Sequence, residues 1–171
     1  QPTGLLRVHS PVAFGQLHML PLIFRFRRHY PNLAVDLMLS DRYVDLVQEG
    51  VDAALRFGHL DSSQLVARRV GGVTRVCVAS PAYLRARGTP RSPADLSSHN
   101  CITYIYLFSN EWEFEDPQGP VSIRVAGDFR ANSALTIRAA ALEGIGIAHM
   151  PGIFVQEDID AGRLVQVLAD Y

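Results

Sequence analysis

The sequence predicts an α/β protein in which short strands alternate with helices. Within residues 1–58, three strand-like runs are separated by two helical segments over short links, which is the βαβαβ order of a parallel sheet with helices on both faces. Farther along, the helical pattern of 134–143 leads directly into the uncharged apolar run 145–151 and repeats the alternation. With 171 residues, 48% of them hydrophobic, the chain can bury a core as one domain or two small lobes.

Three strands are expected in the first part of the chain, over 5–10, 33–40 and 51–58. In the second of these, Leu33, Val35, Leu37 and Leu39 alternate with other residues and therefore share one face of the strand.

Two helices are expected between these strands. The first covers 11–30 and is kinked or restarted at Pro21, because proline lacks the N–H that a helix interior needs. The second covers 41–50, with Asp41 as its N-terminal cap and Gly50 at its end.

The middle of the chain carries two short helical starts with the same punctuation. In the first, Ser80 caps the helix, Pro81 occupies its first position and Gly88 closes it. In the second, Asp95 follows the pair Ser92 and Pro93 at the spacing of a capping box.

Further strands are expected after these helices. The runs 101–106, 112–115 and 121–127 read as strands, and the last two are expected to pair across the loop 116–120. The tail then adds a helix that ends near Gly162 and one more strand.

The stretch GIGIAHMP, residues 144–151, resembles a phosphate-binding loop only superficially. Such a loop follows a strand and opens a helix, whereas Gly144 follows a helix whose cap is Asn132 or Ser133. Gly144 is therefore expected to end that helix, and Gly146 to allow another backbone to approach closely. His149 then lies at the carboxyl end of a buried strand, either as a ligand contact or as a structural histidine.

Composition and motifs argue against several other functions. The net charge is −1 and all sixteen basic residues are arginine, without the basic stripe of a nucleic-acid-binding domain. Cys77 and Cys101 lack metal-ligand spacing and are expected to be buried reduced thiols, with one disulfide as the alternative. No hydrolase, metalloprotease or P-loop motif occurs, and the six histidines show no ligand spacing. The chain is therefore expected not to be an enzyme and to bind no metal and no cofactor.

Four stretches of the chain form a more specific pattern: DLVQEGVDAALRFG (45–58), ASPAYLRARGTPRSPADLSSHNCI (79–102), ANSALTIRAAALEGIGIAHMP (131–151) and AGRLVQVL (161–168). In order and spacing they resemble the effector-binding domain of LysR-type transcriptional regulators, especially the branch resembling regulators that respond to aromatic carboxylates. The resemblance covers nearly the whole chain. It implies two Rossmann-like lobes joined by crossover strands, as in type 2 periplasmic binding proteins, with a small-molecule cleft between the lobes.

On that map, the first lobe covers about 1–76 plus the end of the chain, and the second about 77–164. The resemblance implies two further segments that are absent here: a winged helix-turn-helix domain before Gln1 and a strand and helix after Tyr171 that complete the first lobe. A secreted two-lobe solute-binding protein of a transporter is the competing interpretation, because it shares this architecture and would also lack its initial methionine, as this chain does at Gln1.

The resemblance also implies the partners. The expected effector is a small molecule, such as an aromatic or other small carboxylate. A homodimer is expected, in which the helix 17–29 and strand 33–39 of one chain meet the helix 134–143 of the other, and a tetramer in the full-length protein. DNA would be bound only through the helix-turn-helix domain, the protein would be cytoplasmic, and no apolar run is long enough to cross a membrane.

Candidate effector contacts follow from a general property of open α/β sheets, which bind ligands at the carboxyl ends of strands and the N-termini of the helices that follow. A cation for a carboxylate, hydroxyl and amide donors, and aromatic faces are expected to meet there. The candidates are Ser10, Pro11, Arg56, Phe57 and Gly58 in the first lobe, and Thr103, Tyr104, Asn132, Ser133 and His149 in the second.

Overall fold

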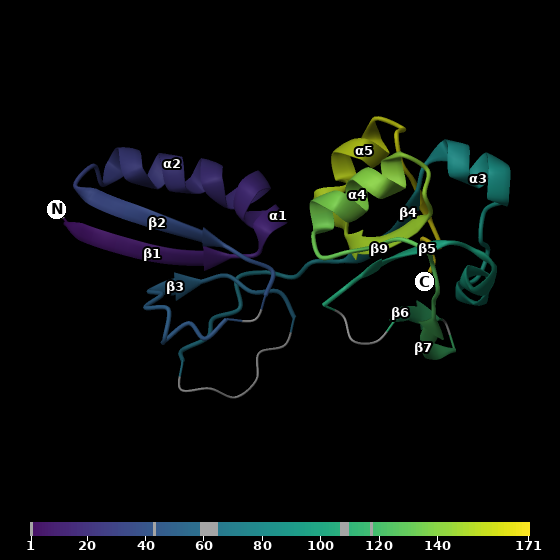
Figure 1. The fold of residues 1–171 in the computed structure, drawn as a ribbon, viewed down its shortest axis with the longest axis horizontal. Coiled ribbons are helices and arrows are strands. Elements are labelled where there is room, and N and C mark those ends of the chain that lie inside the picture. Colours follow the sequence, from purple (N-terminus) through teal and green to yellow (C-terminus); the bar gives the residue numbers. More distant parts are fainter. Residues whose placement is uncertain (1, 43, 59–64, 107–109, 117) are drawn as a thin grey trace. The chain divides into compact units, whose positions relative to one another are not determined.

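The computed structural model describes residues 2–42, 44–58, 65–106, 110–116 and 118–171. Tertiary contacts divide the chain into two units, Gln1–Gly72 and Val73–Tyr171 (Figure 1). Both units are α/β, as the alternating pattern predicts. Each is described below by itself.

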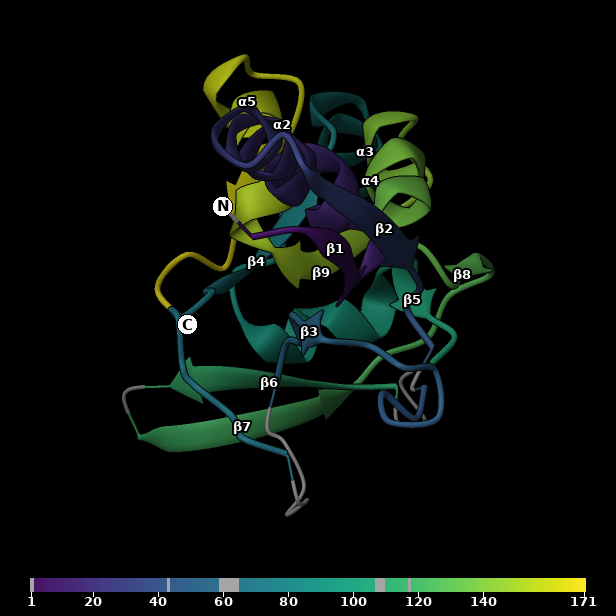
Figure 2. The same ribbon diagram turned by 90° about the vertical axis from the view of Figure 1, so that its left-hand side faces the viewer.

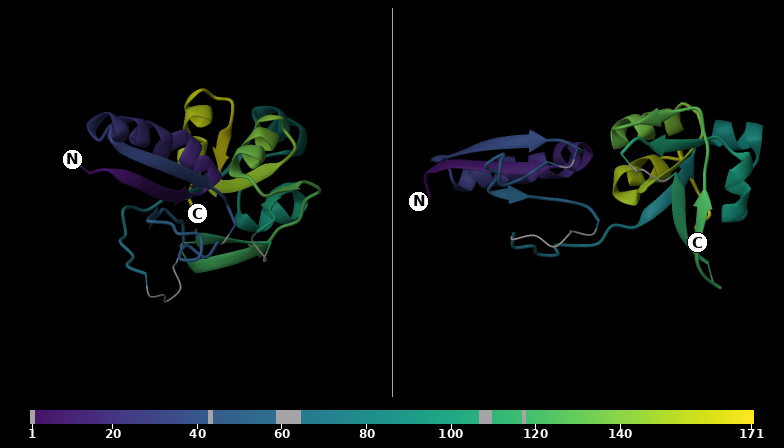
Figure 3. Two further views of the ribbon diagram at one scale, coloured as in Figure 1. Left: turned by 60° about the vertical axis from the view of Figure 1, so that its left-hand side comes forward. Right: turned by 60° about the horizontal axis from the view of Figure 1, so that its bottom comes forward.

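The first unit is a parallel three-stranded sheet in the order β2-β1-β3. Strand β1 (Gly4–Ser10) pairs along its whole length with β2 (Leu33–Leu39), and both strands confirm their predicted ranges closely. The chain connects them through α1 (Val12–Phe14), a π-helical segment (Gly15–Met19) and α2 (Leu20–His29), which runs along the sheet (Figure 3). The helical conformation continues without a break from Val12 to His29, and Pro21 lies in the first turn of α2, directly after the π-helical segment. The predicted restart at this proline is therefore not observed.

The predicted helix over 41–50 is wrong. Residues 46–50 form hydrogen-bonded turns, and Tyr43 lies outside the described residues. The side chain of Asp45 accepts the N–H groups of Val47 and Gln48 at 2.9 and 3.1 Å, which closes a local turn in place of a helix. Because Val47 is 70% exposed, this segment buries no apolar face that would stabilise so short a helix.

Asp41 has a different role from the predicted one. Its carboxylate accepts the N–H of Val12 at 2.9 Å and thus satisfies a free donor at the start of α1. Gly50 does end the turn, in the left-handed conformation at φ +62°, where glycine is favoured.

The third strand is much shorter than expected. Only Ala53–Ala54 (β3) pair with β1, whereas a strand over 51–58 is predicted. Both residues of β3 are exposed, so little side-chain packing holds a longer strand at this edge of the sheet. Among the described residues of this unit, helical segments occur only between β1 and β2, and the expected second helical layer is therefore not observed.

The second unit contains a five-stranded mixed sheet in the order β10-β4-β9-β5-β8. Its strands are β4 (Arg75–Ala79), β5 (Cys101–Tyr104), β8 (Arg130–Ala131), β9 (Ile147–Pro151) and β10 (Val165–Val167). Strands β5 and β9 are parallel, whereas β4 is antiparallel to both of its neighbours. The alternation of strands and helices along the sequence does not reveal that this sheet combines parallel and antiparallel strands.

The helices of the second unit begin and end where the sequence predicts. They are α3 (Pro81–Arg87), a 3-10 helix (Pro93–Ser98), α4 (Ala134–Leu142), a short 3-10 turn (Gly152–Phe154) and α5 (Gln156–Asp160). The Ser80 hydroxyl accepts the N–H of Tyr83 at 3.2 Å, and the Asp95 carboxylate accepts that of Ser92 at 2.9 Å. Gly144 follows α4 at φ +77°, which confirms it as the helix stop.

The predicted hairpin is confirmed as the antiparallel pair β6 (Glu111–Asp116) and β7 (Gly119–Arg124). Figures 1 and 2 show the helices α4 and α5 on one side of the five-stranded sheet and this hairpin on the other. Trp112 and Phe114 from the hairpin pack into a buried cluster with Cys77, Cys101 and Ile147 of the sheet. The second unit therefore has three layers, in the order helices, sheet and hairpin.

Candidate functional site

In the first unit, the predicted contacts lie at the carboxyl ends of neighbouring strands. Ser10 ends β1 and is fully buried, with Pro11 directly after it. Arg56 and Phe57 follow β3, which pairs with β1 at His9. The Arg56 guanidinium donates to the Val44 carbonyl at 2.9 Å.

Phe57 and Gly58 complete this group. The ring of Phe57 meets that of Phe14 in α1 edge to face at 5.5 Å, and Gly58 adopts a left-handed conformation at φ +92°. Sequence reasoning therefore located these residues correctly at one edge of the sheet, although β3 is short.

His9 is a residue that sequence reasoning missed. It is 2% exposed, and neither ring nitrogen has a hydrogen-bond partner among the described residues. Burial lowers the pKa of His9, the charge of Arg56 lowers it further, and Asp41 and Glu49 oppose the shift. The strand pattern could have revealed a polar residue inside β1, but not that the ring nitrogens would lack partners.

In the second unit, four polar side chains lie together at the start of α4, and three of them belong to predicted effector contacts. Ser133 is the N-cap residue, which decides between the two predicted caps, and its hydroxyl makes no capping hydrogen bond within the described part of the chain. The Asn132 amide donates to the Tyr106 hydroxyl at 3.4 Å, and the rings of Tyr104 and Tyr106 meet edge to face at 5.8 Å. Unbonded N–H groups in the first turn and a hydroxyl favour an anion at this position.

Thr103 is separated from this group by the alternation of side chains along β5. It is 3% exposed and follows Cys101 on the face that the hairpin covers, whereas Tyr104 points to the other face. The structure therefore brings Tyr104, but not Thr103, to the start of α4.

His149 also lies on the hairpin face. It is the third of the five residues of β9, and its ring lies 5.3 Å from the rings of both Trp112 and Phe114. Burial lowers the pKa of His149 to about 3, and the nearby Arg75 adds to this shift, so the ring is neutral at pH 7. Since α4 packs on the opposite face, the structure does not bring His149 to Ser133.

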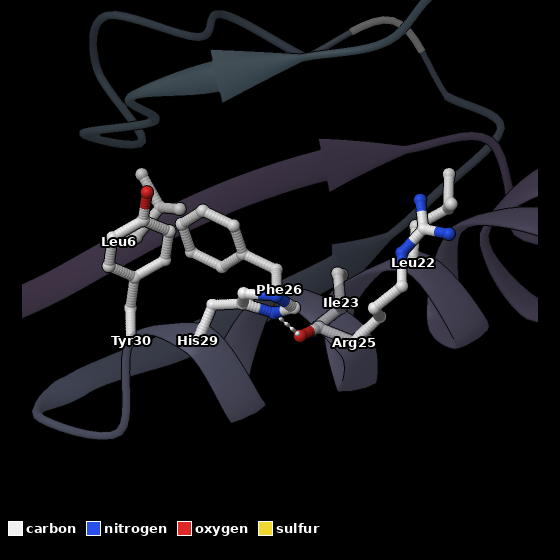
Figure 4. A pocket seen from close by; sticks show the side chains of 7 residues that line it. All are labelled: Leu6, Leu22, Ile23, Arg25, Phe26, His29 and Tyr30. Carbon is white, nitrogen blue, oxygen red and sulfur yellow. Dashed lines mark hydrogen bonds between the residues drawn. The ribbon is translucent and has the colours of Figure 1, made fainter.

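The described surface of each unit contains a hollow. A hollow of about 440 Å³ in the first unit is lined by Leu6 of β1, by side chains of α2, among them Phe26, and by Tyr30, which follows α2 (Figure 4). A cavity of about 740 Å³ in the second unit is lined by the hairpin and by β4, with His149 in its wall. Of the predicted contacts, only His149 lines either of them.

The described residues contain no group of three or more His, Cys, Asp or Glu side chains placed to hold a metal ion. No helix in them combines the length and apolar character needed to cross a membrane.

Two α/β units with polar and aromatic groups at their strand ends define a ligand-binding domain of the type 2 periplasmic-binding-protein-like class. Residues 1–171 match the family model described as the LysR substrate binding domain. The chain belongs to this family and is the effector-binding regulatory domain of a LysR-type transcriptional regulator.

Relatives of known sequence agree with this assignment. The chain is 37% identical over 171 residues to the HTH-type transcriptional regulator CrgA of Neisseria meningitidis serogroup C (strain 8013), covering 99% of this chain and 56% of that protein. It is 34% identical over 173 residues to the HTH-type transcriptional regulator DmlR of Escherichia coli (strain K12), with the same coverages. The chain thus spans little more than half the length of these relatives.

Solved structures give the same fold. The regulatory domain of CrgA from Neisseria meningitidis superimposes with a TM-score of 0.87 at 34% identity, covering 99% of this chain and 83% of that one. The regulatory domain of AphB from Vibrio vulnificus gives a TM-score of 0.84 at 30% identity, covering 98% of this chain and 85% of that one. None of these findings supports the solute-binding protein interpretation.

Proposed function

We propose that this domain senses a small carboxylate and passes that signal to the DNA-binding part of its parent protein. The observation that carries the proposal is the start of α4, where Ser133, Asn132 and Tyr104 present hydroxyl, amide and aromatic groups around the first turn of a nine-residue helix. Such a turn favours negative charge through its unbonded N–H groups and the helix dipole.

In the first unit, Arg56 is the cation that we propose for binding a carboxylate. Arg56 follows β3, with Phe57 and Gly58 next in the chain, and β3 pairs with β1, which Ser10 ends and Pro11 follows. A guanidinium binds a carboxylate through two parallel hydrogen bonds, and Phe57 in this unit, like Tyr104 in the second, offers an aromatic face for the body of the molecule. Each unit by itself thus offers groups that suit an aromatic or other small carboxylate. Thr103 is proposed to support the end of β5 from its buried position.

Calorimetric titration tests this assignment. A panel of benzoate-like and aliphatic acids is titrated into the wild-type chain and into Ser133→Ala and Arg56→Ala variants. We expect one class of acid to bind and each substitution to weaken binding about tenfold or more, because each removes one donor to the carboxylate. Matched controls are Ser97→Ala and Arg124→Ala, which remove an exposed hydroxyl and an exposed guanidinium outside these groups. Equal affinities in all five proteins would reject the placement of the site.

We also propose that the domain dimerises, and that the full-length protein forms a tetramer. Helix α2 has no buried residue, and Leu22, Phe24 and Phe26 are 52%, 56% and 37% exposed. Leu22 and Phe26 lie one turn apart on one side of α2, whereas Phe24 lies on another side. Exposed apolar side chains of this size are typical of an interaction surface. The proposed contact is the one that the family resemblance implies, between α2 and β2 of one chain and α4 of the other.

Sedimentation at high micromolar concentration tests the dimer. Phe24→Asp is expected to shift the chain toward the monomer because it places a charge in the apolar contact. Val47→Asp changes an apolar residue that is more exposed, at 70%, but lies in the turn after β2, and is expected to leave the mass unchanged. A monomeric wild-type chain at all concentrations would contradict the proposal.

The activity of the whole protein is proposed from its relatives. A parent protein with a helix-turn-helix segment would bind DNA through that segment in the cytoplasm and would have no enzymatic activity. An effector changes the output of such a protein only by binding its two conformations with different affinity. Measuring DNA binding of the full-length regulator with and without the acid found above tests this step.

A further inference from the structure

The cavity of about 740 Å³ lies entirely within the second unit and is separate from the start of α4. It lies between the β6–β7 hairpin and β4, with contributions from β10 and the following residues. The hairpin covers the face of the sheet opposite to α4 (Figure 2). Since the hairpin lines the cavity, the cavity and the proposed effector contacts at α4 are on different sides of this sheet. Its volume lies within the range of about 300–1,000 Å³ that is typical of small-molecule sites.

Aromatic rings form part of the wall of this cavity. Trp112 and Phe114 are 5% and 6% exposed, and both line the cavity. His149 lies between them and stacks on Phe114 with an interplanar angle of 20°. Because burial keeps the His149 ring neutral, it adds to this wall without adding a charge. Rigid rings of this kind suit a flat apolar molecule.

Arg75 supplies a cation at the wall of the same cavity. Its side chain lies on the hairpin face of β4, and its guanidinium donates to the carbonyl of His149 at 2.5 Å. Within the described residues, no carboxylate lies within 4.0 Å of this guanidinium, whereas Arg138 and Arg163 both pair with Asp158. Burial against the sheet lowers the pKa of Arg75, although the residue as a whole keeps an exposed surface.

The other charges at the cavity are the carboxylates of Glu111, Glu113 and Glu115. On β6 these residues alternate with Trp112 and Phe114 and are exposed, so their side chains point away from the buried face of the hairpin. Arg75 is therefore the charged hydrogen-bond donor that lies next to the aromatic wall.

We propose that this cavity binds a planar aromatic anion, whose carboxylate accepts hydrogen bonds from Arg75 and whose rings lie against Trp112 and Phe114. A molecule with two fused rings fills this cavity better than a molecule with one ring, so 2-naphthoate is the probe. This is a second site, independent of the effector contacts at α4. In this proposal His149 is part of the cavity wall, whereas the sequence predicts it as an effector contact at the end of a strand.

Trp112 is the single tryptophan of the chain, so its indole N–H gives one signal in a nitrogen-15 NMR spectrum that reports on this cavity alone. Titration of the 171-residue chain with 2-naphthoate is expected to shift that signal in a saturable manner, with contacts between naphthoate and indole protons in a nuclear Overhauser spectrum. The neutral isostere 2-naphthamide is expected to bind at least about tenfold more weakly, because it cannot accept charge-assisted hydrogen bonds from Arg75.

Variants separate the cavity from the rest of the surface. Arg75→Gln is expected to raise the Kd for 2-naphthoate about tenfold, and Arg75→Lys is expected to raise it less, since it keeps the charge but not the planar donor pair. Arg124→Gln removes an exposed arginine on the same hairpin that does not line the cavity, and is expected to leave the Kd unchanged. Ser133→Ala is also expected to have no effect, which distinguishes this site from the effector contacts.

The proposal is overturned if the indole signal of the folded wild-type chain does not move with millimolar 2-naphthoate, or if the acid and its amide bind equally well. The comparison of acid with amide needs no substitution, so it remains decisive even if Arg75→Gln fails to fold.

Discussion

A guanidinium nitrogen of Arg163 lies 2.7 Å from the carboxylate of Asp158, which is fully buried. Arg138 of α4 donates to the same carboxylate at 3.0 Å, so Asp158 joins α4, α5 and the turn before β10. Burial by itself would raise the pKa of Asp158, but the hydrogen bonds from Arg138 and then Arg163 outweigh it and hold the pKa below its ordinary value.

Asp158→Asn is expected to destabilise the chain by about 3 kcal/mol, since it removes one partner from a buried ion cluster. Because the folded pKa is depressed, the carboxylate stabilises the fold above its unfolded pKa of about 3.9, and this contribution is lost as pH falls through the folded pKa. Urea unfolding as a function of pH measures both effects. Asp160→Asn is the control, because Asp160 is exposed on the same helix and bonds only Gln156 within the described residues. Equal unfolding midpoints for the two variants would contradict the role given to Asp158.

Gly146→Ala is expected to destabilise the second unit by about 3 kcal/mol, because a Cβ at this position would collide with the backbone carbonyl of Asn100. That carbonyl accepts the N–H of Ile147 at 2.9 Å and cannot move away freely. Gly71→Ala meets no atom within 4 Å and is expected to be nearly neutral. Thermal unfolding of the two variants makes the comparison, and a stable Gly146→Ala protein would show that the strands separate more easily than the structure indicates.

Neither cysteine is expected to react with a thiol reagent in the folded chain. Cys77 and Cys101 are free thiols with 3% and 0% exposure, and burial raises the pKa of each to about 12. Titration with a disulfide reagent at pH 8 should therefore give two thiols only after unfolding in guanidinium. Ser97→Cys, which places a thiol on the surface, should react at once in the folded protein. Rapid reaction of the native thiols would mean that the hairpin opens readily.

His149 is expected to stay neutral in the folded protein down to about pH 4.5, since its pKa is about 3. In the unfolded chain the ring binds a proton near pH 6.5, so the unfolded state holds more protons and stability falls as pH decreases from about 6.5. His149→Gln should reduce this dependence between pH 6.5 and 4.5, and the remainder belongs in part to His9, whose pKa is also lowered. Exchange of the exposed His29 for Gln is the control. Ring proton shifts of His149 that titrate near pH 6.5 would show that the burial is not maintained.

Much of the second unit could be predicted because its signals are local. Ser80 and Gly88 bound α3, Gly144 ends α4, and the alternation of Trp112 and Phe114 with charged residues marks a strand with one buried face. Each of these features depends on the backbone conformation of a few neighbouring residues. The same approach failed over 41–50, where Asp41 caps α1 and Asp45 closes a turn, because the hydrogen-bond partner of a cap residue is chosen by tertiary contacts.

The sequence by itself determined the order of strands and helices outside 41–50, the ends of α3 and α4 and the family to which the chain belongs, since these follow from short-range patterns of glycine, proline, polar and apolar residues. The tertiary structure alone decided which face of the sheet the hairpin covers. That choice separates His149 and Thr103 from Ser133 and Tyr104, although all four were predicted at one edge. A two-residue period tells which side chains share a face, but only the packing of distant segments settles what lies against that face.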